Sequence, residues 1–285
     1  IPNLSFKLLF EGFNDIKNKV LVFGFFLLFN NLFFQLDTIL LSLWEGDKTV
    51  GIYQAAFMLI MLPLVIPDIF INTLMPLLSR LNVENPLQWK KVGYLMNKIL
   101  IAIVLPISII LFVCADQIIK IIYGLNNYTE TIPILRIFAL TLFVRFSLET
   151  YALMLTTSDR QKIRLYTVIV ATLLNFVINY ILIPLYGAYG AAIVSLITNI
   201  FVGIIYYATN SGLVSEYLFN VKTFSFFLIS FVIAYLFWLI KSINLFITIP
   251  IVGFIFILII YYYFFTKAER ELIFSKDFRL MFIKK

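Results

Sequence analysis

The sequence contains no histidine and only one cysteine, Cys114. Histidine is the commonest metal ligand and the usual general base, and a lone cysteine cannot form a disulfide within the chain. The sequence also lacks an Asp-x-Asp metal pair, a glycine-rich phosphate-binding loop and any long loop that could carry catalytic groups. We therefore expect no enzymatic activity, no metal site and no bound cofactor.

Charge is scarce as well. Only 13% of the 285 residues are charged, whereas 62% are hydrophobic, and the mean hydropathy is +1.00. Soluble domains contain about 45–50% apolar residues. The chain holds 31 phenylalanines and 16 tyrosines, which is more large apolar side chain than a water-soluble core of this size can bury. This composition is that of an integral membrane protein.

Apolar runs long enough to cross a bilayer as helices recur along the chain. Short polar clusters such as WEGDK, TTSDRQKIR and LYGAYG separate these runs. We predict an all-α integral membrane protein with about eight transmembrane helices. The predicted spans are residues 20–43, 52–78, 94–115, 132–156, 163–185, 188–209, 222–241 and 245–265.

The distribution of cations predicts the orientation. Seventeen of the 22 lysines and arginines lie in the loops and tails on the side of the membrane that carries the N-terminus in this arrangement of spans. By the positive-inside rule, this places both termini in the cytoplasm. The formal net charge of +7 would also suit a nucleic-acid-binding protein, but cationic cytoplasmic loops account for it, and we expect no nucleic-acid partner.

Polar side chains interrupt the first predicted span. At 100° per residue, Asn30, Asn31 and Asp37 lie on one face of this helix. A carboxylate at the centre of a membrane helix costs roughly 2.5–3.5 kcal/mol to insert. This face therefore either lines a cavity or meets a polar partner on another helix.

Two further polar pairs lie on the fourth and fifth predicted spans. Arg145 and Glu149 are four residues apart, close enough to pair along one helix, and Asn175 and Asn179 have the same spacing. The charged pair is either a cavity-lining site or a structural ion pair, and the asparagines either line a cavity or join helices. Ser195, Thr198 and Asn199 form a weaker cluster on the sixth span. The candidate pathway residues are Asn30, Asn31, Asp37, Arg145, Glu149, Asn175 and Asn179.

Three blocks of the sequence carry a resemblance to a known family. They are DTILLSLWEGDKTVGIYQAAFMLIMLPLVIPDIFINTLMPLLSRL, IIYGLNNYTETIPILRIFAL and LNFVINYILIPLYGAYGAAIVSLITN. In this order they resemble polysaccharide flippases of the MOP superfamily, the O-antigen or Wzx type of lipid-linked oligosaccharide exporter. The likeness covers most of residues 15–210.

The resemblance implies a domain organisation. That family has two bundles of six helices around a central cavity, often followed by two extra helices. The present chain would correspond to the second bundle and the extra pair, a C-terminal half whose N-terminal bundle is missing. The chain begins Ile-Pro-Asn, and we expect it to be a fragment or a processed chain. The expected parts are a cytoplasmic linker at 1–19, a six-helix transport bundle at 20–210, two additional transmembrane helices at 211–266 and a basic cytoplasmic tail at 267–285.

The resemblance also implies a function, namely transport of a polyprenyl-diphosphate-linked glycan across the bacterial inner membrane by alternating access. Arg145 would offer a cation to the diphosphate, and Asp37 would exchange a coupling ion, H⁺ or Na⁺. The last two spans would form an external groove for the polyprenyl tail or for membrane lipid. The alternatives are a drug or lipid exporter of the same superfamily and a membrane glycan polymerase or glycosyltransferase, which would need the catalytic groups that the sequence lacks.

Overall fold

The computed structural model describes residues 6–124, 128–218, 221–239 and 245–274, and within these ranges the chain is helical, with no strand. The prediction of an all-α protein is confirmed. The elements are α1 (Phe6–Trp44), α2 (Asp47–Glu84), α3 (Pro86–Val113), α4 (Ala115–Ile122), α5 (Thr131–Thr157), α6 (Gln161–Leu218), α7 (Val221–Leu239), α8 (Leu245–Ile259), the π-helical turn η1 (Ile260–Phe264) and α9 (Lys267–Phe274).

The helix α6 is a hairpin. Its 58 residues contain a reversal at Gly187, where φ is 53° and ψ is −134°. Arg160, just before α6, donates from Nη1 to the Thr209 carbonyl at 3.2 Å across 49 positions of sequence, whereas a straight helix would separate these residues by about 74 Å. The first arm, 161–186, and the second arm, 188–218, therefore run antiparallel.

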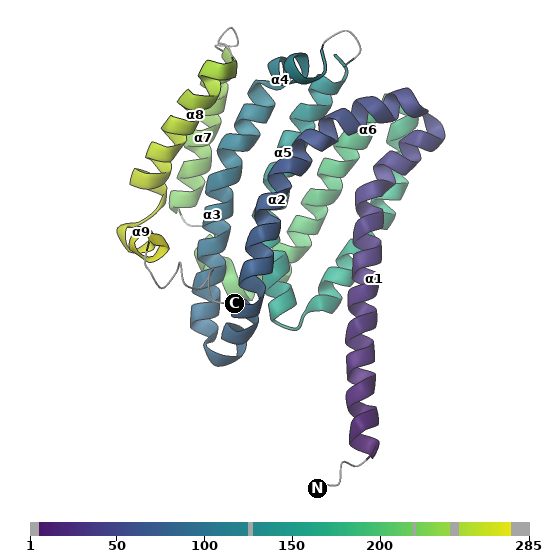
Figure 1. Cartoon of the computed structure of the whole chain (residues 1–285), viewed down its shortest axis with the longest axis vertical. Coiled ribbons are helices and arrows are strands. Elements are labelled where there is room, and N and C mark those ends of the chain that lie inside the picture. The colour runs from purple at the N-terminus through teal and green to yellow at the C-terminus, as the bar shows by residue number, and fades with distance from the viewer. Residues whose placement is uncertain (1–5, 125–127, 219–220, 240–244, 275–285) are drawn as a thin grey trace.

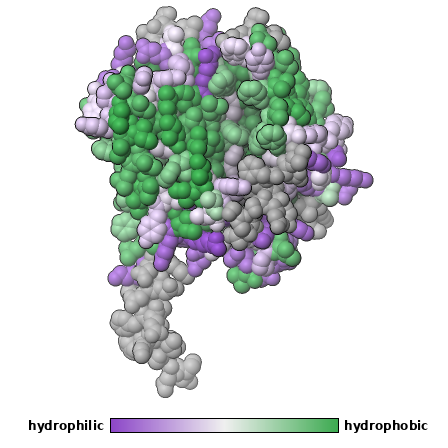
Figure 2. Space-filling view, turned by 180° about the vertical axis from the view of Figure 1, so that it is seen from behind, coloured by the Kyte–Doolittle hydropathy of each residue, from purple (hydrophilic) through white to green (hydrophobic). Residues whose placement is uncertain are grey.

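The predicted membrane spans agree with this arrangement. Seven of the described helices are long and apolar enough to cross a membrane, and α6 crosses twice because of its reversal at Gly187. This gives the eight expected crossings. Figure 2 shows a broad band of hydrophobic side chains across one face, with hydrophilic side chains gathered at its two ends.

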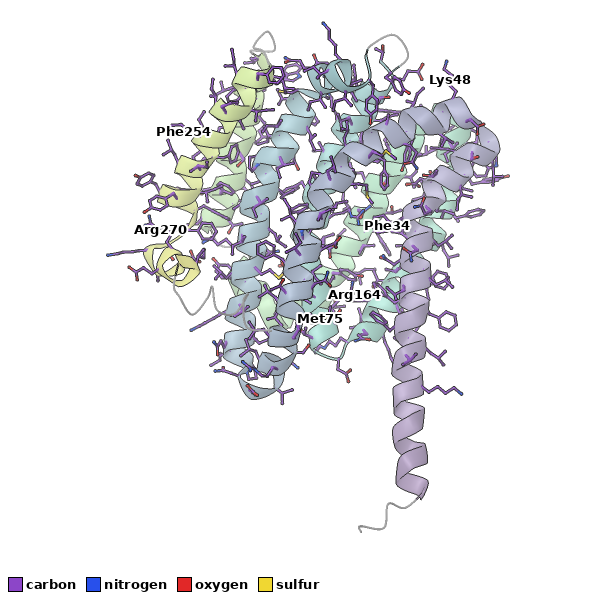
Figure 3. The ribbon with its side chains drawn as sticks, viewed as in Figure 1. Phe34, Lys48, Met75, Arg164, Phe254 and Arg270 are labelled. Atoms are coloured by element: carbon purple, nitrogen blue, oxygen red, sulfur yellow. The ribbon has the colours of Figure 1, made fainter. Side chains whose placement is uncertain are left out.

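The ends of the bundle separate cleanly in Figure 1. The α1–α2 turn, the reversal of α6 and α4 lie at one end, and the α2–α3 turn and the α5–α6 turn lie at the other. Lys48 marks the first of these ends in Figure 3, whereas Arg270, on α9, lies between the two ends. We name them the reversal end and the α5–α6 end. The cation count predicts that the α5–α6 end is cytoplasmic.

Local sequence explains one of the tight turns. The Asn85 side chain accepts a hydrogen bond from the Gln88 backbone N–H at 3.1 Å and so caps α3. Pro86 follows at the first helical position, where no backbone donor is needed. The chain therefore ends α2 and begins α3 with a single residue between them.

Helices α2, α3, α5 and α6 form the packed centre, while α7 and α8 lie beside α3 at one edge (Figure 1). Trp89 of α3 is buried and donates from Nε1 to Thr157 Oγ1 of α5 at 3.1 Å. Gly93 permits this close approach, since a Cβ there would lie 2.6 Å from Met154 Sδ.

Two local features differ from the expected helices. The short helix α4 was not predicted, because its eight residues are too few to resemble a span. The helix α1 begins at Phe6, so the segment expected to be a linker is helical from that residue onward; its role as a linker stays a prediction. Within α2, Pro63, Pro67 and Pro76 lie inside the helix, and Figure 1 shows that α2 bends.

Candidate functional site

A buried hydrogen-bond cluster surrounds Asp37 at the centre of the bundle. Its Oδ2 accepts from Tyr53 Oη of α2 at 2.8 Å. Its Oδ1 accepts from Asn175 Nδ2 at 2.9 Å and from Asn179 Nδ2 at 2.6 Å, both on the first arm of α6. Ser195 of the second arm lies close enough to Tyr53 to interact with its hydroxyl. Two separate segments, α2 and the first arm of α6, thus direct donors to one carboxylate on α1.

The Asp37 carboxylate is buried among neutral groups. The Asp37 side chain is only 4% exposed, and the donors that reach it are all neutral. A carboxylate so buried is stabilised by hydrogen bonds alone, without a neighbouring cation in contact. Among the described residues, Asn179 Oδ1 is buried and has no hydrogen-bond partner.

A second polar cluster surrounds a cavity of about 70 Å³ between α1, α5 and α6. Arg145 and Glu149 of α5 line it, together with Asn30 of α1 and Asn199 of the second arm of α6. The Arg145 guanidinium lies 3.8 Å from the centroid of the Phe34 ring of α1. This contact covers one face of the guanidinium and leaves its N–H edges available.

Arg145 and Glu149 line the cavity without pairing directly. In the described part of the chain their heads make no direct salt bridge, although each influences the other electrostatically. Arg145 stacks on Phe34 instead, because the four-residue spacing allows a pair but does not force one. The two charges share a cavity rather than neutralise each other in contact.

Arg164 is a third charged group at this cavity, and it is not among the candidate pathway residues predicted from the sequence. It lies at the beginning of α6, donates from Nη1 to Thr156 Oγ1 and stacks at 4.4 Å on the Phe26 ring. Its position three residues inside α6, on the same face as Asn175 and Asn179, is the signal that could have revealed it.

Six of the seven candidate residues fall into these two clusters. Asp37, Asn175 and Asn179 form one, and Asn30, Arg145 and Glu149 line the other. Asn31 does not join them, because it is exposed on the surface of α1. Tyr53 belongs to the first cluster and was missed. No group of three or more Asp, Glu or Cys side chains that could hold a metal ion occurs in the described ranges.

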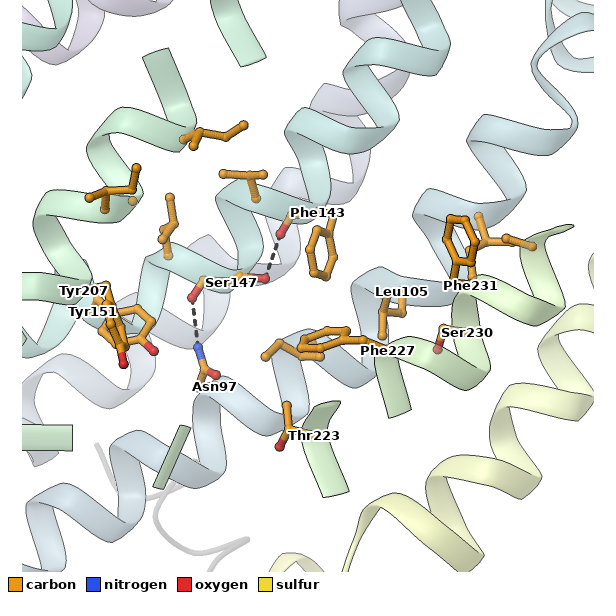
Figure 4. Close-up of a pocket in the computed structure, with 18 residues that line it drawn as sticks. Asn97, Leu105, Phe143, Ser147, Tyr151, Tyr207, Thr223, Phe227, Ser230 and Phe231 are labelled. Carbon is orange, nitrogen blue, oxygen red and sulfur yellow. Dashed lines mark hydrogen bonds between the residues drawn. The ribbon is translucent and has the colours of Figure 1, made fainter. Parts of the chain in front are cut away.

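A larger, apolar groove of about 660 Å³ lies between α7 and the bundle. Figure 4 shows Tyr151 and Tyr207 side by side at one end of it, with Phe227 and Phe231 projecting from α7. Phe231 is 74% exposed, so the groove opens toward the lipid-facing surface. The other lining residues include Ile101, Leu105, Ile109, Phe143, Leu148, Ile200, Ile204 and Ala234.

The helix α9 is attached beside this groove by one buried cation. Lys98 Nζ of α3 lies 2.8 and 3.0 Å from the two carboxylate oxygens of Glu269 and 4.9 Å from the Phe264 ring centroid. Burial raises the pKa of Glu269, but hydrogen bonds from Lys98 and from Thr266 outweigh it and place the pKa below its usual value. The Glu269 carboxylate also accepts from the Thr266 N–H at 2.7 Å, which caps α9.

Comparison with known proteins assigns this architecture to a family. Residues 23–181 match the MatE family model. The chain belongs to the MatE family. This MatE region contains α1 from residue 23, α2 to α5 and most of the first arm of α6, and so holds both Asp37 and Arg145. No curated protein sequence matches the chain.

Two solved structures share the fold of this MatE chain. The lipid II flippase MurJ in an inward closed conformation aligns with a TM-score of 0.67 and 17% identity over 83% of this chain and 52% of its own. A MOP superfamily transporter from Pyrococcus furiosus aligns with a TM-score of 0.56 and 16% identity over 72% and 46%. The chain thus spans about half the length of each neighbour. The expectation of a transport protein rather than an enzyme agrees with this family.

Proposed function

We propose that this chain forms one helical bundle of a transporter that moves polyprenyl-diphosphate-linked oligosaccharide across the bacterial inner membrane for polysaccharide or O-antigen export. The observation that carries the proposal is the position of an apolar groove, open toward lipid, beside a polar cavity that contains arginine. Such a pair of sites matches a solute with an apolar tail and an anionic head. The flippase among the structural neighbours supports a lipid-linked solute.

The groove between α7 and the bundle suits the tail. Its lining is almost wholly hydrocarbon and aromatic, and its few polar groups are bonded within the protein, as Asn97 Nδ2 is to the Ser147 carbonyl at 2.9 Å (Figure 4). An apolar chain that leaves lipid for this groove loses no hydrogen bonds and gains close contacts with the aromatic rings. A polar glycan would gain nothing there.

The arginine cavity suits the head group. A guanidinium presents a planar edge of N–H donors that matches phosphate oxygens, and Phe34 holds the Arg145 plane in place. The fixed orientation reduces the entropy lost when a phosphate binds. Arg145 is therefore the residue that we assign to the diphosphate.

Asp37 is the group that we assign to coupling by H⁺ or Na⁺. Asp37 lies on α1 and its donors come from α2 and the first arm of α6, so a change in its charge would alter the fit between these helices. A coupling ion does work only where its affinity differs between two conformations. A shift of α1 against α6 would change this affinity by moving the asparagine donors.

We further propose that a second bundle faces this one in the working transporter, with both termini in the cytoplasm. Both structural neighbours are about twice as long as the aligned region. The central pathway would then lie between the two bundles, and this chain would supply Asp37 and Arg145 from one side.

An exporter of a drug or another lipid is the alternative that one observation favours. The aromatic side chains Phe143, Tyr151, Tyr207, Phe227 and Phe231 around the groove would accept an apolar aromatic molecule equally well. Such a solute needs no phosphate partner, so the two functions differ in their dependence on Arg145.

The deciding experiment measures surface glycan in cells that depend on the complete transporter containing this segment. Export of the lipid-linked glycan that fails without the transporter and returns with it, while drug resistance stays constant, is the expected result. Restored drug resistance with unchanged surface glycan would overturn the proposal in favour of the alternative.

A further inference from the structure

The two polar clusters follow one another along shared helix faces inside the bundle. Four helix faces contribute to this arrangement, with polar residues at spacings of four, seven or eleven positions, which return to the same side of a helix. These residues are Asn30 and Asp37 on α1, Arg145, Glu149 and Thr156 on α5, Arg164, Asn175 and Asn179 on the first arm of α6, and Ser195, Asn199 and Tyr206 on the second arm. We call this set the polar seam.

The residues of the polar seam follow one another along the length of the bundle. Asp37 lies seven residues, or about 10 Å, along α1 from Asn30, and Arg164 lies nearer the α5–α6 end still. Figure 3 shows Phe34 closer than Arg164 to the end that carries Lys48. The order from the centre outward is therefore Asp37, then Arg145 with Glu149, then Arg164.

Two cavities follow this order. The cavity of about 70 Å³ contains Arg145 and Glu149, and a second, of about 10 Å³, contains Thr156 and Gln161 at the α5–α6 turn. Arg164 lines both cavities, together with Phe33 and Phe34 in the larger and with Phe23 and Phe26 in the smaller. Arg164 thus stands between the two cavities.

On the other side of Asp37 the bundle is closed by hydrocarbon. One helical turn toward the reversal end, the facing positions are Leu40 and Leu41 of α1, Ile183 of the first arm and Ala191 of the second, all buried. A cation cannot cross such a layer at acceptable cost, since it offers no oxygen ligand. These buried side chains therefore separate Asp37 from the reversal end on the α1 and α6 sides.

Arg164 has the features of a movable barrier. Its guanidinium lies on the Phe26 ring and donates to Thr156, yet among the described residues its Nε is buried and has no hydrogen-bond partner. A fixed positive charge in a narrow polar passage repels cations. The partner-free Nε leaves the side chain incompletely bonded in its present position, which lowers the cost of moving it.

We propose that the polar seam is the route by which a small monovalent cation, Na⁺ or H⁺, reaches Asp37 from the α5–α6 end, and that Arg164 on Phe26 closes this route. The inference rests on the proposed coupling role of Asp37. The charged groups that face the route are Arg145 and Glu149 from α5, Arg164 from α6 and Asp68, which acts on both α5 charges, from α2. The negative charge of Glu149 offsets the positive charge of one arginine inside the polar seam. The charge of Arg164 therefore determines the electrostatic potential at the α5–α6 end of the seam.

Cysteine labelling tests the route without any transport assay. In the full chain with Cys114→Ala, a single cysteine is placed by Asn199→Cys, inside the seam, or by Ala191→Cys, beyond Asp37. A cationic, membrane-impermeant methanethiosulfonate is applied to vesicles from each side. We expect labelling of Asn199→Cys from the α5–α6 side alone, and about tenfold faster labelling after Arg164→Ala, because the repelling charge is gone.

Matched variants control for the charge and for folding. Lys162→Ala removes an exposed cation two residues from Arg164 and is expected to leave the labelling rate unchanged. Phe26→Ala keeps the charge but removes its support, and is expected to accelerate labelling even if Arg164→Ala lowers the yield of folded protein. Unchanged rates in both Arg164→Ala and Phe26→Ala, or labelling of Ala191→Cys, would overturn the one-ended route.

A second experiment tests whether the route serves a cation at Asp37. Replacing choline by Na⁺ at constant pH, or lowering the pH from 8 to 6 with each rate expressed relative to that of a free thiol at the same pH, is expected to change the Asn199→Cys labelling rate by at least about threefold in the Asp37 protein and to have no effect after Asp37→Asn. Equal responses with and without Asp37 would overturn the proposal. If both labelling experiments give the expected results while glycan export fails, the route is correct and only the proposed solute is wrong.

Discussion

Asp37 and Tyr53 are joined by a hydrogen bond of 2.8 Å, and they stand at equal distances in sequence from the turn between α1 and α2. Thr38 and Gln54, each one position further along the chain, are joined at 2.6 Å. The reversal of α6 has the same geometry, because Asn179 and Ser195 are equally far from Gly187 and both belong to the Asp37 cluster. Two helical hairpins therefore bring their polar residues to one point.

Replacing Asp37 by Asn is expected to abolish the response of transport to the cation gradient. The amide keeps the size of the carboxylate but cannot titrate, and its NH₂ group would face the donors of Asn175 or Asn179. One unsatisfied buried donor costs about 1–3 kcal/mol, so a modest loss of thermal stability accompanies the loss of coupling. Transport measured with and without a pH or Na⁺ gradient checks this. Gradient-dependent transport by Asp37→Asn would contradict the coupling role.

Replacing Arg145 by Ala is expected to reduce glycan export at least tenfold, equivalent to about 1.4 kcal/mol, while the amount of protein in the membrane stays normal. Arg145→Lys is expected to recover part of the activity, because an ammonium is a poorer but real phosphate partner. Surface glycan and membrane abundance are measured together. If Arg145 were only structural, Arg145→Ala would lower abundance, and the double loss of Arg145 and Glu149 would be milder than either single loss.

Much of this architecture follows from the sequence. The eight crossings are set by long apolar runs, and LYGAYG marks the reversal at Gly187 because only glycine readily adopts its φ of 53°. The positions of Asp37, Asn175 and Asn179 on polar helix faces follow from the 100° repeat. These faces meet because α1 and the first arm of α6 are neighbours. The spacing of polar residues along the sequence does not predict which helices are neighbours.

The rest depended on contacts between helices. Tyr53 looked like an ordinary aromatic residue near a span end, and only the fold of the α1–α2 hairpin brings its hydroxyl to Asp37. Arg164 belongs to the polar cluster TTSDRQKIR, which separates two predicted spans. The structure shows that α6 begins at Gln161 and that Arg164 lines the cavity. Arg145 and Glu149 had the spacing of a pair, but the Phe34 ring competes for the guanidinium. Side-chain choice among several partners is a tertiary property.

Replacing Gly187 by Ala is expected to destabilise the protein by on the order of 1–3 kcal/mol, the cost of a strained backbone conformation. The strain is in the backbone itself, because the nearest atoms to an added Cβ, on Glu45 and Thr49, lie 3.8 Å away. Gly24→Ala is the matched control, since it lies within α1 with open space around it and should be neutral or slightly stabilising. Thermal unfolding in detergent measures both. Equal melting temperatures would show that the reversal tolerates a side chain.

The contact between Lys98 and Glu269 is expected to stabilise the docking of α9 in a pH-dependent way. The pKa of Glu269 is lower in the folded protein than its usual value, so its contribution is fully present above the unfolded pKa of about 4.3 and is lost as the pH falls through the lower, folded pKa. Glu269→Gln should remove this acid-dependent part of the melting temperature. It should also destabilise the protein at neutral pH, because Lys98, 4% exposed, keeps its charge without a carboxylate.

Lys98→Met combined with Glu269→Gln should destabilise the protein less than Glu269→Gln alone, since no buried charge is then left unpaired. Melting temperatures of the three proteins between pH 7 and pH 3 decide the matter. A double variant less stable than Glu269→Gln would mean that Lys98 acts through its aromatic contacts with Tyr94, Phe264 and Phe265 rather than through the ion pair.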